Sequence, residues 1–257
     1  MAWLYNHKAM GEIAIHCAER YSELTAWQVE EISLRMEEEG REFEERYKEM
    51  LVVLLMGTPS KANQRRVRKL LGEVPLAELL PLGKFLLTDK DLYTFPDIWD
   101  GLRTPMVRLS DCTIRQFSVA DALFYKYSKG REELYAKQLV ASLYCWGGRA
   151  FDPLLLPKIA EVTDSISPGK RAAIVYAYRC IREYIIGRYP VIFPKATEEA
   201  DKPNFQRQGG YTPFSKVIAA MAMDSVQPLG NWHECSGTRL YDFLDVLSES
   251  IQRSKSR

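Results

Sequence analysis

The sequence predicts a mainly α-helical protein: a multi-helix globular body with at most a small β-hairpin and a small C-terminal helical subdomain. Apolar residues recur at three- and four-residue steps through much of the chain, which is the periodicity of amphipathic helices. Capping residues precede several of these segments. The strand–helix–strand alternation that predicts a parallel sheet does not occur. The 257 residues, 46% of them apolar, suffice for a buried core.

Two amphipathic helices are predicted near the N-terminus. Thr25 and Gln28 form a capping box at the start of the first helix, which Gly40 interrupts. The second helix begins near residue 43 and ends at Gly57. Its apolar side chains share one face: Phe43, Tyr47, Met50, Leu51, Leu54 and Leu55.

An acidic stretch covers residues 37–45. Its carboxylates are Glu37, Glu38, Glu39, Glu42, Glu44 and Glu45. We interpret them as the solvated face of a helix, which is the usual role of such charge runs. The alternative is a docking surface for a basic partner.

A basic segment follows, and it predicts a helix with an apolar edge at Val67, Leu70 and Leu71. Its cations are Lys61, Arg65, Arg66, Arg68 and Lys69. The segment contains no aromatic residue or recognised nucleic-acid motif, and the acidic helix before it offers an intramolecular partner. The net charge of the chain is only +1. This pattern disfavours nucleic acid, which stays as the alternative function and would also use the terminal cations Arg253, Lys255 and Arg257.

Short helices and turns are predicted over residues 76–87, because Pro75, Pro81 and Gly83 prevent one long helix. The one modest strand signal lies at residues 104–109. If a small hairpin forms, we expect this strand to pair with residues 85–87.

The central block is rich in aromatic residues and predicts three helices. Ser118 and Asp121 form a capping box for the first helix, which ends at Gly130. The second helix covers residues 132–146, and the third covers residues 168–187 after a serine cap. One buried stripe is predicted for the third helix: Ile174, Tyr178, Ile181 and Ile185.

The C-terminal part is predicted to contain a polar linker at residues 195–210 and a helical hairpin, with helices at 214–222 and 240–251 around a turn-rich connection at 228–237. The three predicted regions are 1–115, 116–194 and 195–257. We expect the apolar faces of the hairpin to bind a partner helix. The residues that form these faces are Phe214, Val217, Ile218, Met221, Leu240, Phe243, Leu244 and Leu247.

The residues predict no catalytic site, metal site or cofactor. His233 and Cys235 are two residues apart without a second ligand pair, which falls short of a zinc site. No nucleophile elbow or phosphate-binding loop is found. The five cysteines contain no C-x-x-C pair, and we expect reduced, packed thiols. Residues 1–10 lack a continuous apolar region, so we expect no signal sequence. The most apolar run, residues 50–56, is too short to cross a bilayer, so we expect no membrane partner.

Several stretches together resemble helical proteins encoded among the tail genes of phages and prophages of Bacteroidetes-like bacteria. These stretches are residues 21–29, 51–57, 117–127, 139–144, 214–222 and 240–247. The chain departs from the pattern at residues 145–148, where an arginine is expected directly after the tyrosine.

This resemblance implies a non-enzymatic tail-assembly factor, such as a chaperone, or a small virion protein. Its partners would be other tail or virion proteins, with homo-oligomerisation as a further alternative. The expected location is the cytoplasm of the bacterial host, and incorporation into the virion stays open.

Overall fold

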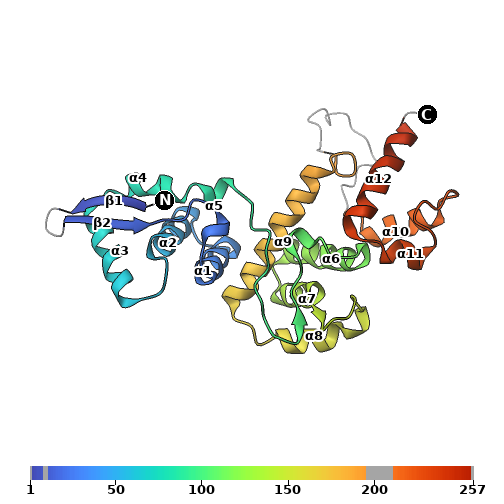
Figure 1. Cartoon of the computed structure of the whole chain (residues 1–257), viewed down its shortest axis with the longest axis horizontal. Coiled ribbons are helices and arrows are strands. Elements are labelled where there is room, and N and C mark those ends of the chain that lie inside the picture. Colours follow the sequence, from blue (N-terminus) through green and yellow to red (C-terminus); the bar gives the residue numbers. More distant parts are fainter. Residues whose placement is uncertain (1, 8–10, 195–210, 256–257) are drawn as a thin grey trace. The chain divides into compact units, whose positions relative to one another are not determined.

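The computed structural model describes residues 2–7, 11–194 and 211–255, and α-helices dominate this part of the chain (Figure 1). The mainly α fold predicted from the sequence is confirmed. The chain divides into two compact units. Unit 1 comprises Met1–Pro96 and Ser167–Cys180, and unit 2 comprises Asp97–Ile166 and Ile181–Arg257.

This division differs from the predicted borders at residues 115 and 194. Helix α9 (Pro168–Arg188) contributes its first part to unit 1 and its last part to unit 2. A helix with a continuous buried stripe can serve two cores, and the sequence pattern does not reveal where one core ends. The predicted linker at residues 195–210 lies outside the described residues.

Unit 1 begins with an antiparallel hairpin that the sequence analysis did not predict. Strand β1 (Ala2–His7) pairs with β2 (Gly11–His16), with Ala2 opposite His16. The helical elements that follow are η1 (Tyr21–Glu23), α1 (Ala26–Glu37), α2 (Phe43–Met56), α3 (Lys61–Glu73), α4 (Leu76–Leu79), η2 (Leu80–Gly83) and α5 (Phe85–Thr88). The short elements from α4 to α5 confirm the expectation for residues 76–87.

The helix ends in unit 1 follow the capping residues. Thr25 and Gln28 form the predicted capping box at α1, where the Thr25 N–H donates to Gln28 Oε1 at 2.9 Å. Gly57 ends α2 at a φ of +68°, a left-handed conformation that favours glycine. One residue departs from its predicted face, because Phe43 is half exposed at the start of α2.

The core of unit 1 includes a buried pair of tyrosines. Tyr21 donates its hydroxyl to the Leu86 carbonyl at 2.9 Å, and the Tyr21 and Tyr176 hydroxyls lie 2.9 Å apart. Tyr176 belongs to the first part of α9, so these bonds hold that part of the helix in unit 1. Ser167 caps α9 as predicted, since its Oγ accepts the Lys170 N–H.

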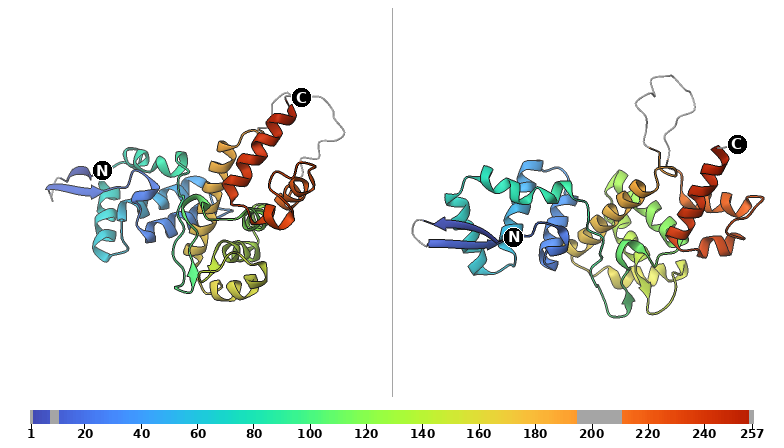
Figure 2. Two further views of the ribbon diagram at one scale, coloured as in Figure 1. Left: turned by 45° about the vertical axis from the view of Figure 1, so that its right-hand side comes forward. Right: turned by 45° about the horizontal axis from the view of Figure 1, so that its top comes forward.

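Unit 2 is built on a helical hairpin to which further helices are added. Its elements are β3 (Leu102–Arg103), η3 (Val107–Leu109), α6 (Ile114–Gly130), α7 (Glu133–Leu143), β4 (Cys145–Trp146), η4 (Pro153–Leu155), α8 (Leu156–Thr163), the last part of α9, α10 (Phe214–Met223), α11 (Trp232–Gly237) and α12 (Leu240–Lys255). Helices α10, α11 and α12 contact α6 (Figures 1 and 2). The C-terminal helices are therefore part of unit 2.

Two local predictions in unit 2 are wrong. Helix α6 begins at Ile114 and not near Ser118, because Thr113 supplies the cap by accepting the Gln116 N–H. The connection at 228–237 contains the short helix α11, whose capping box is formed by Asn231 and Glu234.

The predicted strand at residues 104–109 is also wrong. Val107–Leu109 is the short helix η3, and the strand β3 lies just before it. The partner of β3 is β4, whereas residues 85–87 belong to helix α5. A ladder of two residues per strand is too short for an alternating pattern to be recognised in sequence.

Candidate functional site

The residues predicted to bind a partner helix lie in the core of unit 2. Seven of them are buried and Val217 is half-buried. The Phe214 ring packs edge-on against Phe117, with centroids 5.1 Å apart. A backbone hydrogen bond also connects α6 to the segment before α12, since the Ile114 N–H donates to the Thr238 carbonyl. The expectation that these faces are free for a partner is corrected, because the chain covers them itself.

A different apolar surface of unit 2 is open. Helices α6, α7 and α8 line a groove of about 500 Å³. The lining residues are Val119, Leu123, Gln138, Ala141, Pro153, Leu156, Pro157 and Ala160. Gln138 is the one polar side chain among them. We call this surface the apolar groove; it has the size and the apolar character typical of ligand-binding clefts.

Helix α6 forms one wall of the apolar groove because it carries apolar residues on two faces. Phe117 and Phe124 are buried in the core, whereas Val119 and Leu123 are half-buried on the groove side. The opposite wall begins at η4, where Asp152 accepts the Leu154 N–H and Pro153 starts the turn.

Positive charge flanks the apolar groove along α6. Arg115, Val119, Leu123 and Lys126 follow one another by four-, four- and three-residue steps, so they share one face of the helix. Arg115 and Lys126 are exposed. The Lys126 ammonium lies 5.3 Å from the centroid of the Tyr135 ring and has no carboxylate partner among the described residues. The groove therefore has a cation at each end of its α6 wall.

The other charges near the apolar groove are mixed. Lys137 on α7 pairs with Asp164 at 2.6 Å, and Glu161 on α8 is exposed. Two leucines on the elements that carry the groove are exposed: Leu134 lies one turn before Gln138 on α7, and Leu154 belongs to η4.

The predicted basic helix, α3, forms a second candidate surface in unit 1. Lys61, Arg65, Arg68 and Lys69 are exposed, and Arg66 is half-buried. The apolar edge is confirmed for Val67 and Leu70, which are buried, whereas Leu71 is exposed. Of the terminal cations, Arg253 pairs with Glu249 at 3.1 Å; the side chain of Lys255 and all of Arg257 lie outside what the structure describes.

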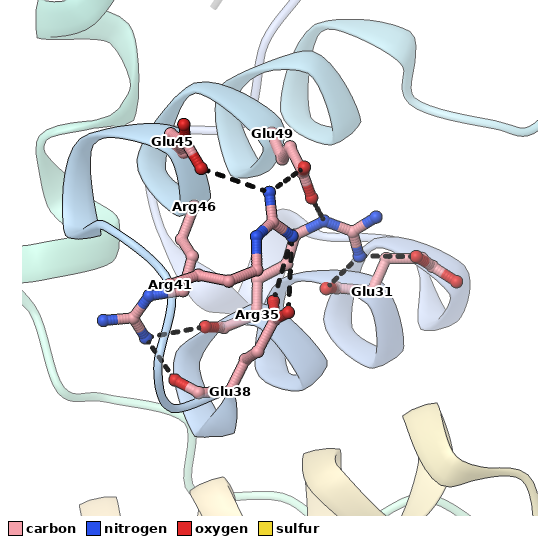
Figure 3. A network of polar contacts seen from close by, with 7 residues as sticks. All are labelled: Glu31, Arg35, Glu38, Arg41, Glu45, Arg46 and Glu49. Carbon is pink, nitrogen blue, oxygen red and sulfur yellow. Dashed lines mark hydrogen bonds and ion pairs between the residues drawn. The ribbon is translucent and has the colours of Figure 1, made fainter.

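The acidic face of α1 and α2 forms a network with arginines from the same segment (Figure 3). Arg35 binds Glu31 and Glu49, at 2.6 and 3.0 Å. Arg41 reaches Glu38, Glu45 and Glu49. The hydrogen bond from Arg41 lowers the pKa of Glu49. Glu38, Glu45 and Glu49 thus pair with arginines of their own segment and not with the cations Lys61, Arg65 and Arg68 of α3.

The cysteine side chains are packed inside the two units. All five cysteines are free and buried, which confirms the packed thiols expected from the sequence. Burial raises the pKa of the Cys112 and Cys145 thiols, and the thiolate is the nucleophilic form.

No group of three or more His, Cys, Asp and Glu residues that could hold a metal ion is found in the described part of the chain. Within the same residues, each helix is too short or too polar to cross a membrane.

The fold and its surfaces define a mainly helical protein with an open apolar groove on one unit and an exposed basic helix on the other. No protein-family model, curated protein or solved structure matches the chain.

The sequence analysis did not identify the apolar groove. A signal was present in Val119 and Leu123, which lie four residues apart on a second apolar face of α6.

Proposed function

We propose that the chain is a non-enzymatic protein-binding factor, and that the apolar groove receives an amphipathic helix from a partner protein. The observation that carries the proposal is the groove itself, an apolar cleft of about 500 Å³ between α6, α7 and α8. Amphipathic helices bind such clefts through apolar anchors spaced by three and four residues.

The charges on α6 indicate which kind of helix fits. Arg115 and Lys126 are eleven positions apart, which corresponds to roughly 16 Å along the helix axis. A partner helix that lies along α6 would place acidic residues at a similar separation, on either side of its apolar anchors. Charge complementarity of this kind selects partners and their orientation.

The resemblance to proteins of phage tail-gene clusters supports a particular setting for this activity. We propose a role in tail assembly or virion structure, with another tail or virion protein as the source of the helix. Binding and release of a helix by an open groove suits an assembly factor of the chaperone type.

Titration calorimetry with designed peptides tests the groove. One helical peptide carries acidic residues eleven positions apart around an apolar stripe, and its partner peptide carries lysines at the same positions. We expect the acidic peptide to bind the full chain and the lysine peptide to bind at least about tenfold more weakly, because like charges repel at Arg115 and Lys126. Equal affinities for the two peptides would contradict the proposed helix class.

Variants locate the binding. Leu123→Glu places a charge in the groove wall and should abolish binding, whereas Met223→Glu alters an exposed apolar residue of α10 and should leave it unchanged. If both variants weaken binding of the acidic peptide to the same extent, the peptide binds non-specifically and not in the groove.

A photo-crosslinker placed at Leu123 tests the setting during phage or prophage induction. Mass spectrometry should identify a tail or virion protein that is crosslinked through an acidic, amphipathic helix. The yield of this crosslink should fall in the Arg115→Glu variant. Crosslinks only to proteins outside the particle and its assembly would remove the tail role but not the groove's binding activity.

A further inference from the structure

We propose that the exposed face of α3 binds the phosphate backbone of a nucleic acid. The surface consists of Lys61, Arg65 and Arg68, with Lys69 at its edge, and we call it the basic ridge. It belongs to unit 1, whereas the apolar groove belongs to unit 2, so the inference is independent of the proposed protein-binding function.

The geometry of α3 presents these cations together. Lys61, Arg65 and Arg68 follow one another by four- and three-residue steps, which places them on one side of the helix over roughly 10 Å of its length. On another side, Val67 and Leu70 are almost completely buried, at 2% and 1% exposure. The buried edge anchors α3, and the ridge is thereby held toward solvent.

Three cations of the basic ridge are not neutralised by any residue in the described part of the chain. Lys61, Arg65 and Arg68 form no ion pair with any described residue. Three of the acids that precede α3 in sequence pair elsewhere, since Arg35 binds Glu49 and Arg41 binds Glu38, Glu45 and Glu49 (Figure 3). In the sequence analysis, possible pairing with these acids argued against nucleic-acid binding. That argument does not apply to Lys61, Arg65 and Arg68, because they form no such pairs among the described residues.

The same structure favours nucleic acid over an anionic membrane. Helices that bind membranes insert an apolar face, and the main apolar edge of α3 is used inside unit 1. Arginine guanidinium groups match phosphate oxygens with two parallel hydrogen bonds. Gly72 continues the ridge at the next four-residue step, and the space around its Cα is open, which permits close approach of a sugar–phosphate strand.

Fluorescence anisotropy with the full chain tests this inference. The probes are a labelled DNA duplex of mixed sequence and the same strand alone, each titrated over a range of KCl concentrations. Three phosphate contacts predict a slope of about −2.7 for log affinity against log salt on duplex DNA, or about a 40-fold loss for a fourfold rise in salt.

The double variant Arg65→Gln, Arg68→Gln should reduce the magnitude of this slope by about 2. The same rise in salt should then lower the affinity only about 3-fold. The charge-preserving variant Arg65→Lys, Arg68→Lys should keep the slope. Arg149→Gln is the matched control, because Arg149 is an exposed arginine of unit 2, and its slope should equal that of the wild type. Circular dichroism checks that each variant keeps its helical content.

Three results would overturn the inference. These are the absence of binding to either probe at low salt, a salt slope that is the same in the double glutamine variant and the wild type, and binding through Arg65 and Arg68 to vesicles of anionic lipid without binding to DNA.

Discussion

Two apolar surfaces of unit 2 look alike in sequence but differ in the structure. Helices α10 and α12 carry apolar stripes, and these are buried against α6 and its neighbours. Helices α6, α7 and α8 also carry apolar residues at helical spacing, and these line an open groove. Amphipathic periodicity therefore identifies a face that needs a partner, but only the packing shows whether the chain itself supplies that partner.

The same contrast holds for charge in unit 1. Glu31, Glu45 and Glu49 of α1 and α2 pair with Arg35 and Arg41 of their own segment. Lys61, Arg65 and Arg68 of the basic ridge lie further along the chain and form no such pairs among the described residues. We infer that the satisfied surfaces hold the fold together and that the open ones are available for binding.

The largest expected effect comes from the covered apolar surface. Phe243 on α12 is completely buried, so Phe243→Ala should lower the free energy of unfolding by about 4 kcal/mol through lost burial and a new cavity. Urea denaturation followed by circular dichroism measures this loss. A change below about 1 kcal/mol would mean that α12 does not contribute to the core as described.

A polar contact holds the start of the C-terminal segment to the same core. Asp121 is 1% exposed and accepts hydrogen bonds from Arg182 at 2.6 Å and Tyr211 at 2.9 Å. Asp121→Asn should cost about 2 kcal/mol of unfolding free energy, because the bonds to a charged acceptor are weakened. Asp224→Asn, at an exposed loop position, is the control and should unfold at the same urea concentration as the wild type.

The open apolar surface should respond in the opposite way. Leu123→Ala should change the free energy of unfolding by no more than about 1 kcal/mol, since Leu123 is only half-buried, yet weaken the acid-flanked peptide about tenfold. Calorimetry and urea denaturation of the same preparation separate the two quantities. A large loss of stability with unchanged peptide affinity would show that Leu123 belongs to the core and not to a binding surface.

The smallest expected effect concerns the arginine–glutamate network. The hydrogen bond from Arg41 lowers the pKa of Glu49 from its usual value of 4.5, so the stabilisation is present above that value and is lost as the pH falls through the folded-state pKa. The free energy of unfolding should therefore decrease on acidification below about pH 4.5 more steeply in the wild type than in Glu49→Gln. Identical acid profiles would show that the network contributes nothing measurable.

The sequence was sufficient for the fold class and for most of the long helices. Thr25 and Ser167 are strong local caps, and the helices begin where these residues predict. Thr113 was overlooked because Ser118 and Asp121 imitate a capping box inside α6. The hairpin β1–β2 and the short ladder β3–β4 depend on pairing between segments, which periodicity does not capture.

The candidate sites were less predictable than the fold. The exposure of Lys61, Arg65 and Arg68 agrees with the sequence pattern, because charged residues of an amphipathic helix face solvent. The sequence could not locate the docking face, because Leu244 and Leu123 look the same in sequence: both are apolar residues at helical spacing. Which one is covered depends on contacts between helices that are more than a hundred positions apart in the chain.

Methyl-based NMR of the full chain with the acid-flanked peptide tests the central claim, that the apolar groove is a helix-binding site. Addition of the peptide should shift the methyl signals of Val119, Leu123, Ala141, Leu156 and Ala160, and leave those of Leu240 and Leu244 unchanged. Shifts confined to α10 and α12, or no shifts at saturating peptide, would contradict the account.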